Sequence, residues 1–140
     1  MASIFTKIIN GELPGRFVWK DSSCVAFMTV APLKPGHVLV VPREEVDHWI
    51  DLEPDLVQHL ALVAQTVSKA IQSGFQPMRV GLMVAGIEVP HVHLHLVPIS
   101  AVHDLDFSNA DNDASAEALD AAAETVRREL RAMGCAEVSD

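Results

Sequence analysis

Apolar residues recur along the chain with two different spacings, and these predict its helices and strands. Where they return every three or four residues the pattern predicts a helix, as from Pro54 to the glycine at position 74. Where short β-branched runs lie between turn residues it predicts strands. The predicted helices span residues 3–10, 54–74 and 114–133, and the first four strands span residues 17–19, 24–30, 37–41 and 78–85.

A fifth strand is predicted at the sharpest pattern in the chain, His91-Val92-His93-Leu94-His95. Side chains alternate faces along a strand, so the three rings would share one face, spaced about 6.6 Å apart along the backbone. The intervening apolar residues would be buried against a helix. The order of elements predicts an α+β fold, with a five-stranded antiparallel sheet and helices on one side.

Composition indicates an ordinary globular protein of 140 residues, which fits one domain. The formal net charge is −9 with only ten Lys and Arg, which argues against a nucleic-acid polymer as partner. No apolar run approaches the ~18 residues needed to cross a bilayer. Cys24 and Cys135 form neither a disulfide framework nor a metal pair, and the N-terminus lacks a signal pattern. We therefore expect a cytoplasmic protein without a membrane partner.

Three histidines on one strand face call for a chemical explanation, whereas isolated ones such as His48, His59 and His103 are read as surface residues. One possibility is metal binding, because histidines two apart on a strand can share a zinc ion. The other is nucleophilic and acid–base work on phosphate, since imidazole titrates near neutral pH and its neutral form is a nucleophile. The residues alone leave both open.

The segment Val89–Pro98, with its alternating histidines, resembles the signature of the histidine-triad (HIT) family. Residues 26–32 and 35–42 are similar to a second hallmark block of that family, and residues 3–14 to its N-terminal block. These blocks occur in the family's order and cover most of residues 3–98. The resemblance implies a single HIT domain over residues 1–140, with residues 99–140 as a C-terminal loop and helix.

The resemblance also implies a mechanism. His93 would attack the α-phosphorus of a nucleotide-like substrate and form a covalent nucleotidyl-histidine, which water then hydrolyses. His95 would contact the phosphate and assist the leaving group, while His91 and His37 would orient His93. No metal or cofactor is required, because imidazole supplies the nucleophile.

The family's nucleoside pocket is apolar, and several residues here match its lining or phosphate-binding positions. Thr29 stands where the family usually has an acidic residue for the ribose hydroxyls, and Ile87 where a glutamine is common. Glu88 stands where some members have a hydroxyl. The expected substrate-binding residues are Ile4, Phe5, Ile8, Phe27, Thr29, Val30, Leu39, Gly86, Ile87 and Glu88.

Three further expectations follow from the resemblance. Some members hold zinc with an N-terminal Cys-x-x-Cys, but Ser3 and Thr6 occupy those positions, so we expect no structural zinc. Family members pair to form one ten-stranded sheet, so we expect a homodimer. The expected function is a metal-independent phosphoramidase or nucleoside phosphate hydrolase. The alternatives are a nucleotide-binding regulatory protein, favoured by Thr29 and Ile87, and a metal-dependent hydrolase.

Overall fold

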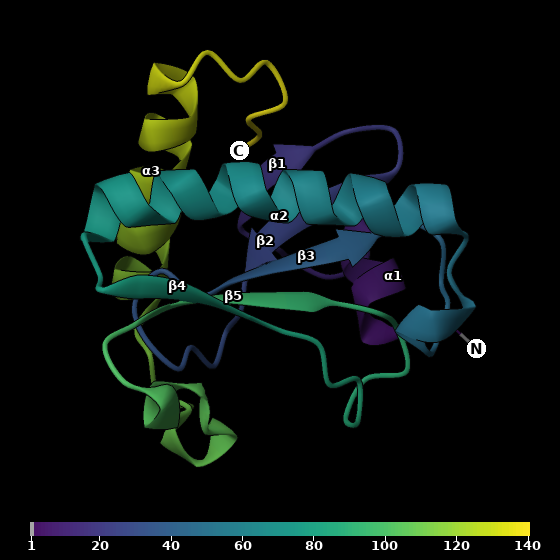
Figure 1. The fold of residues 1–140 in the computed structure, drawn as a ribbon, viewed down its shortest axis with the longest axis horizontal. Helices are drawn as coiled ribbons and strands as arrows, with labels where there is room; N and C mark the ends of the chain where they lie inside the picture. Colours follow the sequence, from purple (N-terminus) through teal and green to yellow (C-terminus); the bar gives the residue numbers. More distant parts are fainter. Residues whose placement is uncertain (1) are drawn as a thin grey trace.

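The computed structural model describes residues 2–140, which form one five-stranded antiparallel sheet, three α-helices and three short 3-10 helices (Figure 1). The strands lie in the order β1-β2-β3-β5-β4. The α+β class and the antiparallel five-stranded sheet predicted from the sequence are confirmed. The elements are α1 (Ile4–Ile9), β1 (Phe17–Lys20), β2 (Cys24–Met28), β3 (Val38–Pro42), η1 (Trp49–Asp51), α2 (Pro54–Phe75), β4 (Arg79–Met83), β5 (Leu94–Ile99), η2 (Val102–Leu105), η3 (Phe107–Asn109) and α3 (Ala116–Ala132).

The two long helices, α2 and α3, pack on one face of the sheet and form the larger hydrophobic core with it. The predicted helical spacing places Leu60, Val63, Val67 and Ile71 of α2 on that face, and all four are buried. Burying each such side chain contributes about 1.5–3 kcal/mol. The prediction that helices lie on one side of the sheet is therefore confirmed for both long helices.

The short helix α1 packs against the opposite face of the sheet. Along β3, Val38 and Val40 join the core under the long helices, while Leu39 and Val41 turn to the other face, as a strand's alternation requires. There they meet Phe5 of α1 in a second, smaller core. This second core lies beside the histidines, because its Phe5 ring contacts His91 and His93.

The end of α2 differs from the prediction that Gly74 terminates it. The helix continues to Phe75, and Gln76 ends it with a left-handed backbone (φ 52°). Gly74 instead marks a close approach of the two long helices, because a Cβ built there would lie 2.6 Å from the Thr125 methyl group of α3. The glycine serves helix packing and not helix termination.

Other boundaries shift by one to three residues. The second strand ends at Met28, so Thr29 and Val30 begin the loop toward β3, and Pro42 belongs to β3. The C-terminal helix starts after Ser115, whose hydroxyl accepts a hydrogen bond from the Ala118 amide, a typical N-cap. The predicted loop at residues 100–113 contains η2 and η3. Within residues 2–140, no helix has the length and apolarity that a bilayer span demands.

Candidate active site

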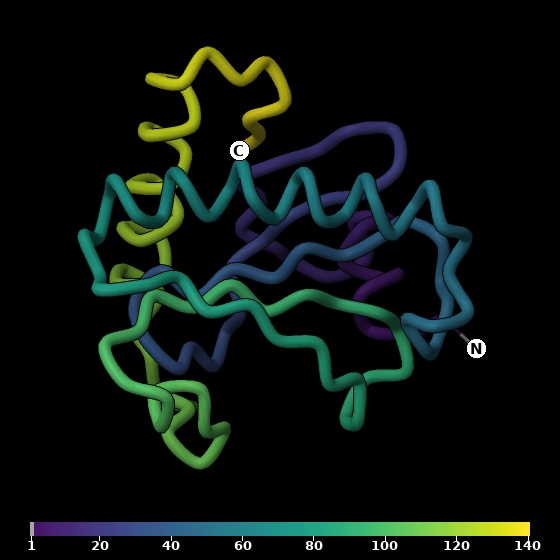
Figure 2. The backbone as a smooth tube through the Cα atoms, in the orientation of Figure 1, coloured from purple at the N-terminus to yellow at the C-terminus, as the bar shows by residue number. Residues whose placement is uncertain are grey.

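The sequence predicted one continuous strand through His91, His93 and His95, but the structure does not have it. The strand β5 begins at Leu94, so His91 and His93 precede it and only His95 lies within it. The backbone hydrogen bonds give the reason: the His91 amide bonds back to the Val89 carbonyl, and the Val92 amide bonds to the distant Val46 carbonyl, outside the regular ladder. The chain before β5 thus runs beside the segment that follows β3 (Figure 2). The predicted alternation nevertheless persists, because Val92, Leu94 and Leu96 all join the core under α2.

His93 is held by the backbone just before it. Its Nδ1 lies 2.7 Å from the His91 carbonyl oxygen, which can only accept a hydrogen bond. Nδ1 therefore carries the proton, and the Nε2 of the neutral ring keeps a free lone pair. The Phe5 and His95 rings contact the His93 ring in T-shaped arrangements, each with a ring-centroid distance of 4.8 Å. This tautomer leaves Nε2 available as a nucleophile.

A second chain of hydrogen bonds fixes His37 and His95. The Leu33 amide donates to Nδ1 of His37 (3.0 Å), so neutral His37 carries its proton on Nε2. That Nε2 donates to Nδ1 of His95 (3.0 Å), which leaves the His95 proton on its own Nε2. Two adjacent rings therefore have opposite roles: His93 offers a lone pair and His95 offers an N–H donor.

Burial keeps all four rings in the neutral form on which these assignments depend. Burial lowers the pKa of His37 to about 3 and that of His95 to about 4, and repulsion from neighbouring imidazoles adds to both shifts. Burial also lowers the pKa of His93 and of His91, partly opposed at His93 by its bond to the His91 carbonyl and by the Glu88 carboxylate. At neutral pH the rings therefore do not repel one another as cations.

Both ring nitrogens of His91 are engaged in hydrogen bonds. Its Nε2 donates to the Pro42 carbonyl (2.8 Å), and its Nδ1 lies 2.7 Å from the Ser3 hydroxyl. Glu45 completes this arrangement by accepting from Ser3 and Thr6. The sequence reasoning missed Glu45, because nothing in its neighbourhood marks it and it lies 42 residues from its Ser3 partner.

Most of the predicted substrate-binding residues surround one small cavity of about 100 Å³ on the α1 side of the sheet. Its wall also includes Arg16. Seven of the ten predicted residues line it: Ile4, Phe5, Ile8, Phe27, Thr29, Val30 and Leu39.

The other three predicted residues do not line this cavity. Gly86, Ile87 and Glu88 lie in the loop between β4 and β5, where Gly86 has a positive φ of 73°. Ile87 is 89% exposed, so its side chain faces solvent. Glu88 is also exposed, but its charge reaches His93, as the pKa of that ring reflects. The structure therefore separates an apolar cavity from this loop.

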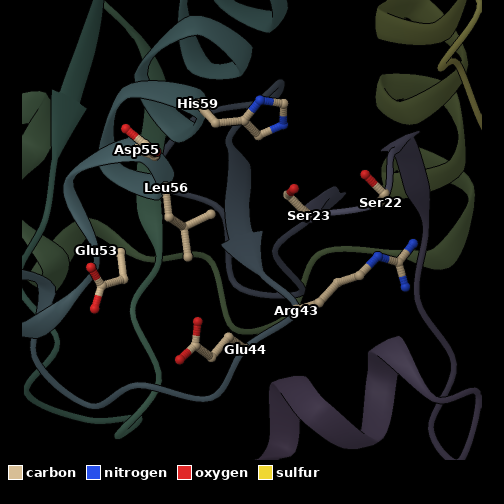
Figure 3. Close-up of a pocket in the computed structure, with 8 residues that line it drawn as sticks. All are labelled: Ser22, Ser23, Arg43, Glu44, Glu53, Asp55, Leu56 and His59. Carbon is tan, nitrogen blue, oxygen red and sulfur yellow. The ribbon is translucent and has the colours of Figure 1, made fainter.

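A larger hollow of about 550 Å³ lies away from the histidine row, between the β1–β2 turn and the start of α2 (Figure 3). Its wall mixes Arg43 and His59 with carboxylates of Glu44, Glu53 and Asp55. In that region His59 bonds to Asp21 (2.8 Å), so it is not the isolated surface residue that the sequence indicated.

Asp21, Cys24 and His59 have the composition of a metal site, but their atoms are already engaged. The Asp21 carboxylate accepts bonds from the Ser23 and Cys24 amides and from the Trp19 indole. Burial raises the pKa of the Cys24 thiol, and the nearby Asp21 charge raises it further. A cysteine binds zinc as the thiolate, which this setting disfavours, and the Asp21 carboxylate instead accepts the hydrogen bonds that close the turn between β1 and β2.

Comparison with known proteins decides the family. A family model for the HIT domain matches residues 10–102. A HIT-like protein of Methanocaldococcus jannaschii, itself uncharacterised, is 37% identical over 99 residues, which cover 68% of this chain and 77% of that protein. The chain belongs to the HIT family. HIT proteins form a superfamily of nucleotide-binding hydrolases and transferases that bind small nucleotide-like ligands.

Solved HIT structures share the fold across almost the whole chain. A zinc-bound histidine-triad protein of Mycobacterium smegmatis superposes with a TM-score of 0.81 at 22% identity, covering 98% of this chain and 99% of its own. A hypothetical histidine-triad nucleotide-binding protein of Sulfolobus tokodaii superposes with a TM-score of 0.80 at 23% identity, covering 92% of each chain. At these identities the likeness establishes the HIT fold, including its C-terminal helix, and nothing more.

Proposed function

We propose that this HIT protein cleaves nucleotidyl conjugates at the α-phosphate through a covalent nucleotidyl-His93 intermediate. One observation carries the proposal: adjacent neutral rings present a lone pair at His93 Nε2 and an N–H at His95 Nε2. A phosphoryl centre needs both, because its phosphorus accepts the nucleophile while its oxygens gain charge that donors stabilise.

The proposed reaction has two steps. The His93 Nε2 lone pair forms a bond to the α-phosphorus as the bond to the leaving group breaks, and the leaving group departs with that electron pair. His95 Nε2–H donates a hydrogen bond to a phosphate oxygen, and solvent protonates a basic leaving group. Water then attacks the phosphorus and loses a proton to solvent. The P–Nε2 bond breaks with its electron pair returning to Nε2, and a nucleoside monophosphate is released. No step requires a metal ion.

The cavity beside the histidines is the proposed nucleoside site. Its apolar wall comes from α1, β2 and β3, and Phe5 contacts both the cavity and the His93 ring. A base bound there would leave its phosphate near the nucleophile. Thr29 would offer one hydroxyl to a ribose.

A homodimer is also part of the proposal, because β4 is an edge strand with exposed side chains. Leu82 on this strand is 56% exposed, and Met78 just before it is 68% exposed. An open apolar edge favours pairing with a second strand. Antiparallel β4–β4 pairing would give the ten-stranded sheet, and light scattering of the purified protein measures whether the dimer forms.

The test is to incubate the purified protein, with chelator present, with an adenosine phosphoramidate and in parallel with a diadenosine polyphosphate. We expect AMP release and, after rapid acid-free quenching, a protein mass increased by one nucleotidyl group. His93→Ala should abolish both, while His103→Ala, which removes an exposed ring, should retain them. AMP release from His93→Ala at the wild-type rate would contradict the proposal.

A binding or regulatory role is the second candidate, and one observation favours it. The cavity of about 100 Å³ is smaller than the roughly 300–1,000 Å³ of most small-molecule sites. AMP binding by calorimetry without AMP release from either substrate would support this second role. Activity that is lost with chelator and restored by zinc would support a metal-dependent hydrolase instead.

A further inference from the structure

Four residues from three separate segments form a hydrogen-bonded group that we call the His91 cluster: Ser3, Thr6, Glu45 and His91. The Ser3 hydroxyl lies 2.7 Å from His91 Nδ1, and the Ser3 amide donates to Glu45 Oε1 at 2.7 Å. The Thr6 hydroxyl donates to the same carboxylate oxygen at 2.6 Å, and the Thr6 amide donates to the Ser3 hydroxyl at 3.0 Å. The cluster connects α1, the segment after β3 and the histidine segment.

The directions of these bonds are fixed by what each atom can do. The Pro42 carbonyl only accepts, so the proton of neutral His91 is on Nε2 and its Nδ1 is an acceptor. Ser3 is the close donor for Nδ1, since the Thr6 hydroxyl is 3.4 Å away and already donates to Glu45. The Ser3 hydroxyl also lies 3.3 Å from the Thr6 hydroxyl, but His91 Nδ1 at 2.7 Å is the nearer acceptor for its single proton. Glu45 therefore aligns Thr6 and the Ser3 backbone, and the Ser3 hydroxyl donates to His91.

His91 in turn holds the nucleophile. Its carbonyl oxygen accepts the Nδ1–H of His93 at 2.7 Å, which is the bond that frees His93 Nε2. The Phe5 ring, from the residue directly before Thr6, contacts His91 and His93 at centroid distances of 5.9 and 4.8 Å. The His91 ring is bonded at both nitrogens, to the Pro42 carbonyl and to the Ser3 hydroxyl, so it anchors the backbone whose carbonyl is the acceptor for His93.

We propose that Ser3, Thr6 and Glu45 are positioning residues that fix His91 and, through its carbonyl, the orientation and tautomer of His93. The inference rests on the proposed function for its kinetic consequence, but not for its structural one. It also links the cavity to the chemistry, because α1 supplies both the cluster and the apolar wall.

This cluster does not fit the zinc ion that some HIT proteins hold. Protein zinc sites use thiolates, imidazoles and carboxylates, whereas two of the four groups here are hydroxyls. The remaining two, Glu45 and His91, are already engaged in the hydrogen bonds of the cluster. In this protein hydrogen bonds connect α1 to His91, whereas in zinc-binding HIT proteins a metal ion can make that connection.

The test compares Ser3→Ala, which removes the donor, with Ser3→Thr, which keeps it. The matched control is Ser115→Ala, because Ser3 and Ser115 both cap a helix but only Ser3 contacts a histidine. The readouts are the ring ¹⁵N chemical shifts of His91 and His93, which report tautomers, and kcat and KM for the adenosine phosphoramidate.

We expect Ser3→Ala to shift the His91 Nδ1 resonance and to lower kcat about tenfold, the effect of one misplaced hydrogen bond, with a smaller change in KM. Ser3→Thr should restore both, and Ser115→Ala should change neither. Glu45→Ala provides a second variant in which folding is secure, because Glu45 is exposed. It should shift the same resonances as Ser3→Ala.

Several results would overturn the inference. Unchanged ring shifts and kcat in both Ser3→Ala and Glu45→Ala would show that the cluster positions nothing. One equivalent of tightly bound zinc in the wild-type protein, lost in Glu45→Ala, would make the cluster a metal site. If the wild type releases no AMP, the proposed function fails, but the ¹⁵N shifts of the variants still decide whether the cluster fixes the two rings.

Discussion

Acidification should destabilise this protein through its buried histidines, and His37 and His95 dominate the effect. Their pKa values in the folded protein are lowered to about 3 and about 4, whereas an unfolded imidazole titrates near pH 6.5. The unfolded state therefore binds more protons between these limits, so stability is full above pH 6.5 and falls as the pH drops toward 3.

The size of this loss of stability depends mainly on the pKa of imidazole in the unfolded state. For any folded pKa at or below about 4, the free energy of unfolding decreases by roughly 2 kcal/mol per ring between pH 7 and pH 5. Because the His37–His95 hydrogen bond couples the two rings, we expect roughly 2–4 kcal/mol for the pair. This is a large part of the ~5–15 kcal/mol by which a typical domain is stable.

The assay is urea denaturation followed by circular dichroism at pH 7, 6 and 5, for the wild type and for His37→Gln. Glutamine can still donate to His95 but does not titrate, so the difference between pH 7 and pH 5 should shrink by about 2 kcal/mol. His95→Gln should shrink it similarly. His48→Gln is the matched control, because it removes an exposed imidazole outside the cluster of rings.

The reasoning would be refuted if both variants kept the full wild-type difference between pH 7 and pH 5. The two rings would then not be neutral in the folded protein at pH 5, and the tautomer assignments that follow from neutrality would fall with them. If His37→Gln does not fold, His95→Gln alone decides the question, because each variant removes one titrating group of the same pair.

Two further predictions concern residues around the site. Gly36→Ala should lower the free energy of unfolding by more than the ~1 kcal/mol of a simple positive-φ substitution, because the added Cβ would lie 2.8 Å from the Phe75 ring. Thermal denaturation measures this loss, and an unchanged melting temperature would contradict the contact. Thr29→Asp should tighten AMP binding severalfold by giving the ribose hydroxyls a carboxylate acceptor. Calorimetry measures the affinity for AMP, and weaker binding would argue against a ribose beside Thr29.

The sequence was most informative where local periodicity decided the structure. Alternation along the histidine segment and helical spacing along α2 were sufficient to predict which of their side chains reach the larger core. Resemblance to the HIT family then identified seven residues that surround one cavity, although they come from α1, β2, the loop after β2, and β3. The core predictions are confirmed because each depended on spacing within a segment, whereas the substrate role of the cavity residues stays a prediction.

Other features depended on contacts between distant segments and could not be predicted. The late start of β5 follows from the Val92 amide bonding to Val46, which no local pattern indicates. Glu45 sits in an unremarkable acidic stretch, and only the fold brings it to Ser3. No local pattern indicates that the Ile87 side chain is almost fully exposed.

The tautomers of the site also lie beyond sequence reasoning, because backbone atoms set most of them. A Leu33 amide fixes His37, a Pro42 carbonyl fixes one nitrogen of His91, and the His91 carbonyl fixes His93. Backbone groups are present whatever the side chain, so substitutions nearby can preserve them. Ser3 is different: it is the one side-chain hydroxyl within 3 Å of a histidine nitrogen in the described chain. Outside the rings themselves, Ser3 is therefore the position among the described residues where a side-chain substitution should most disturb the histidine row.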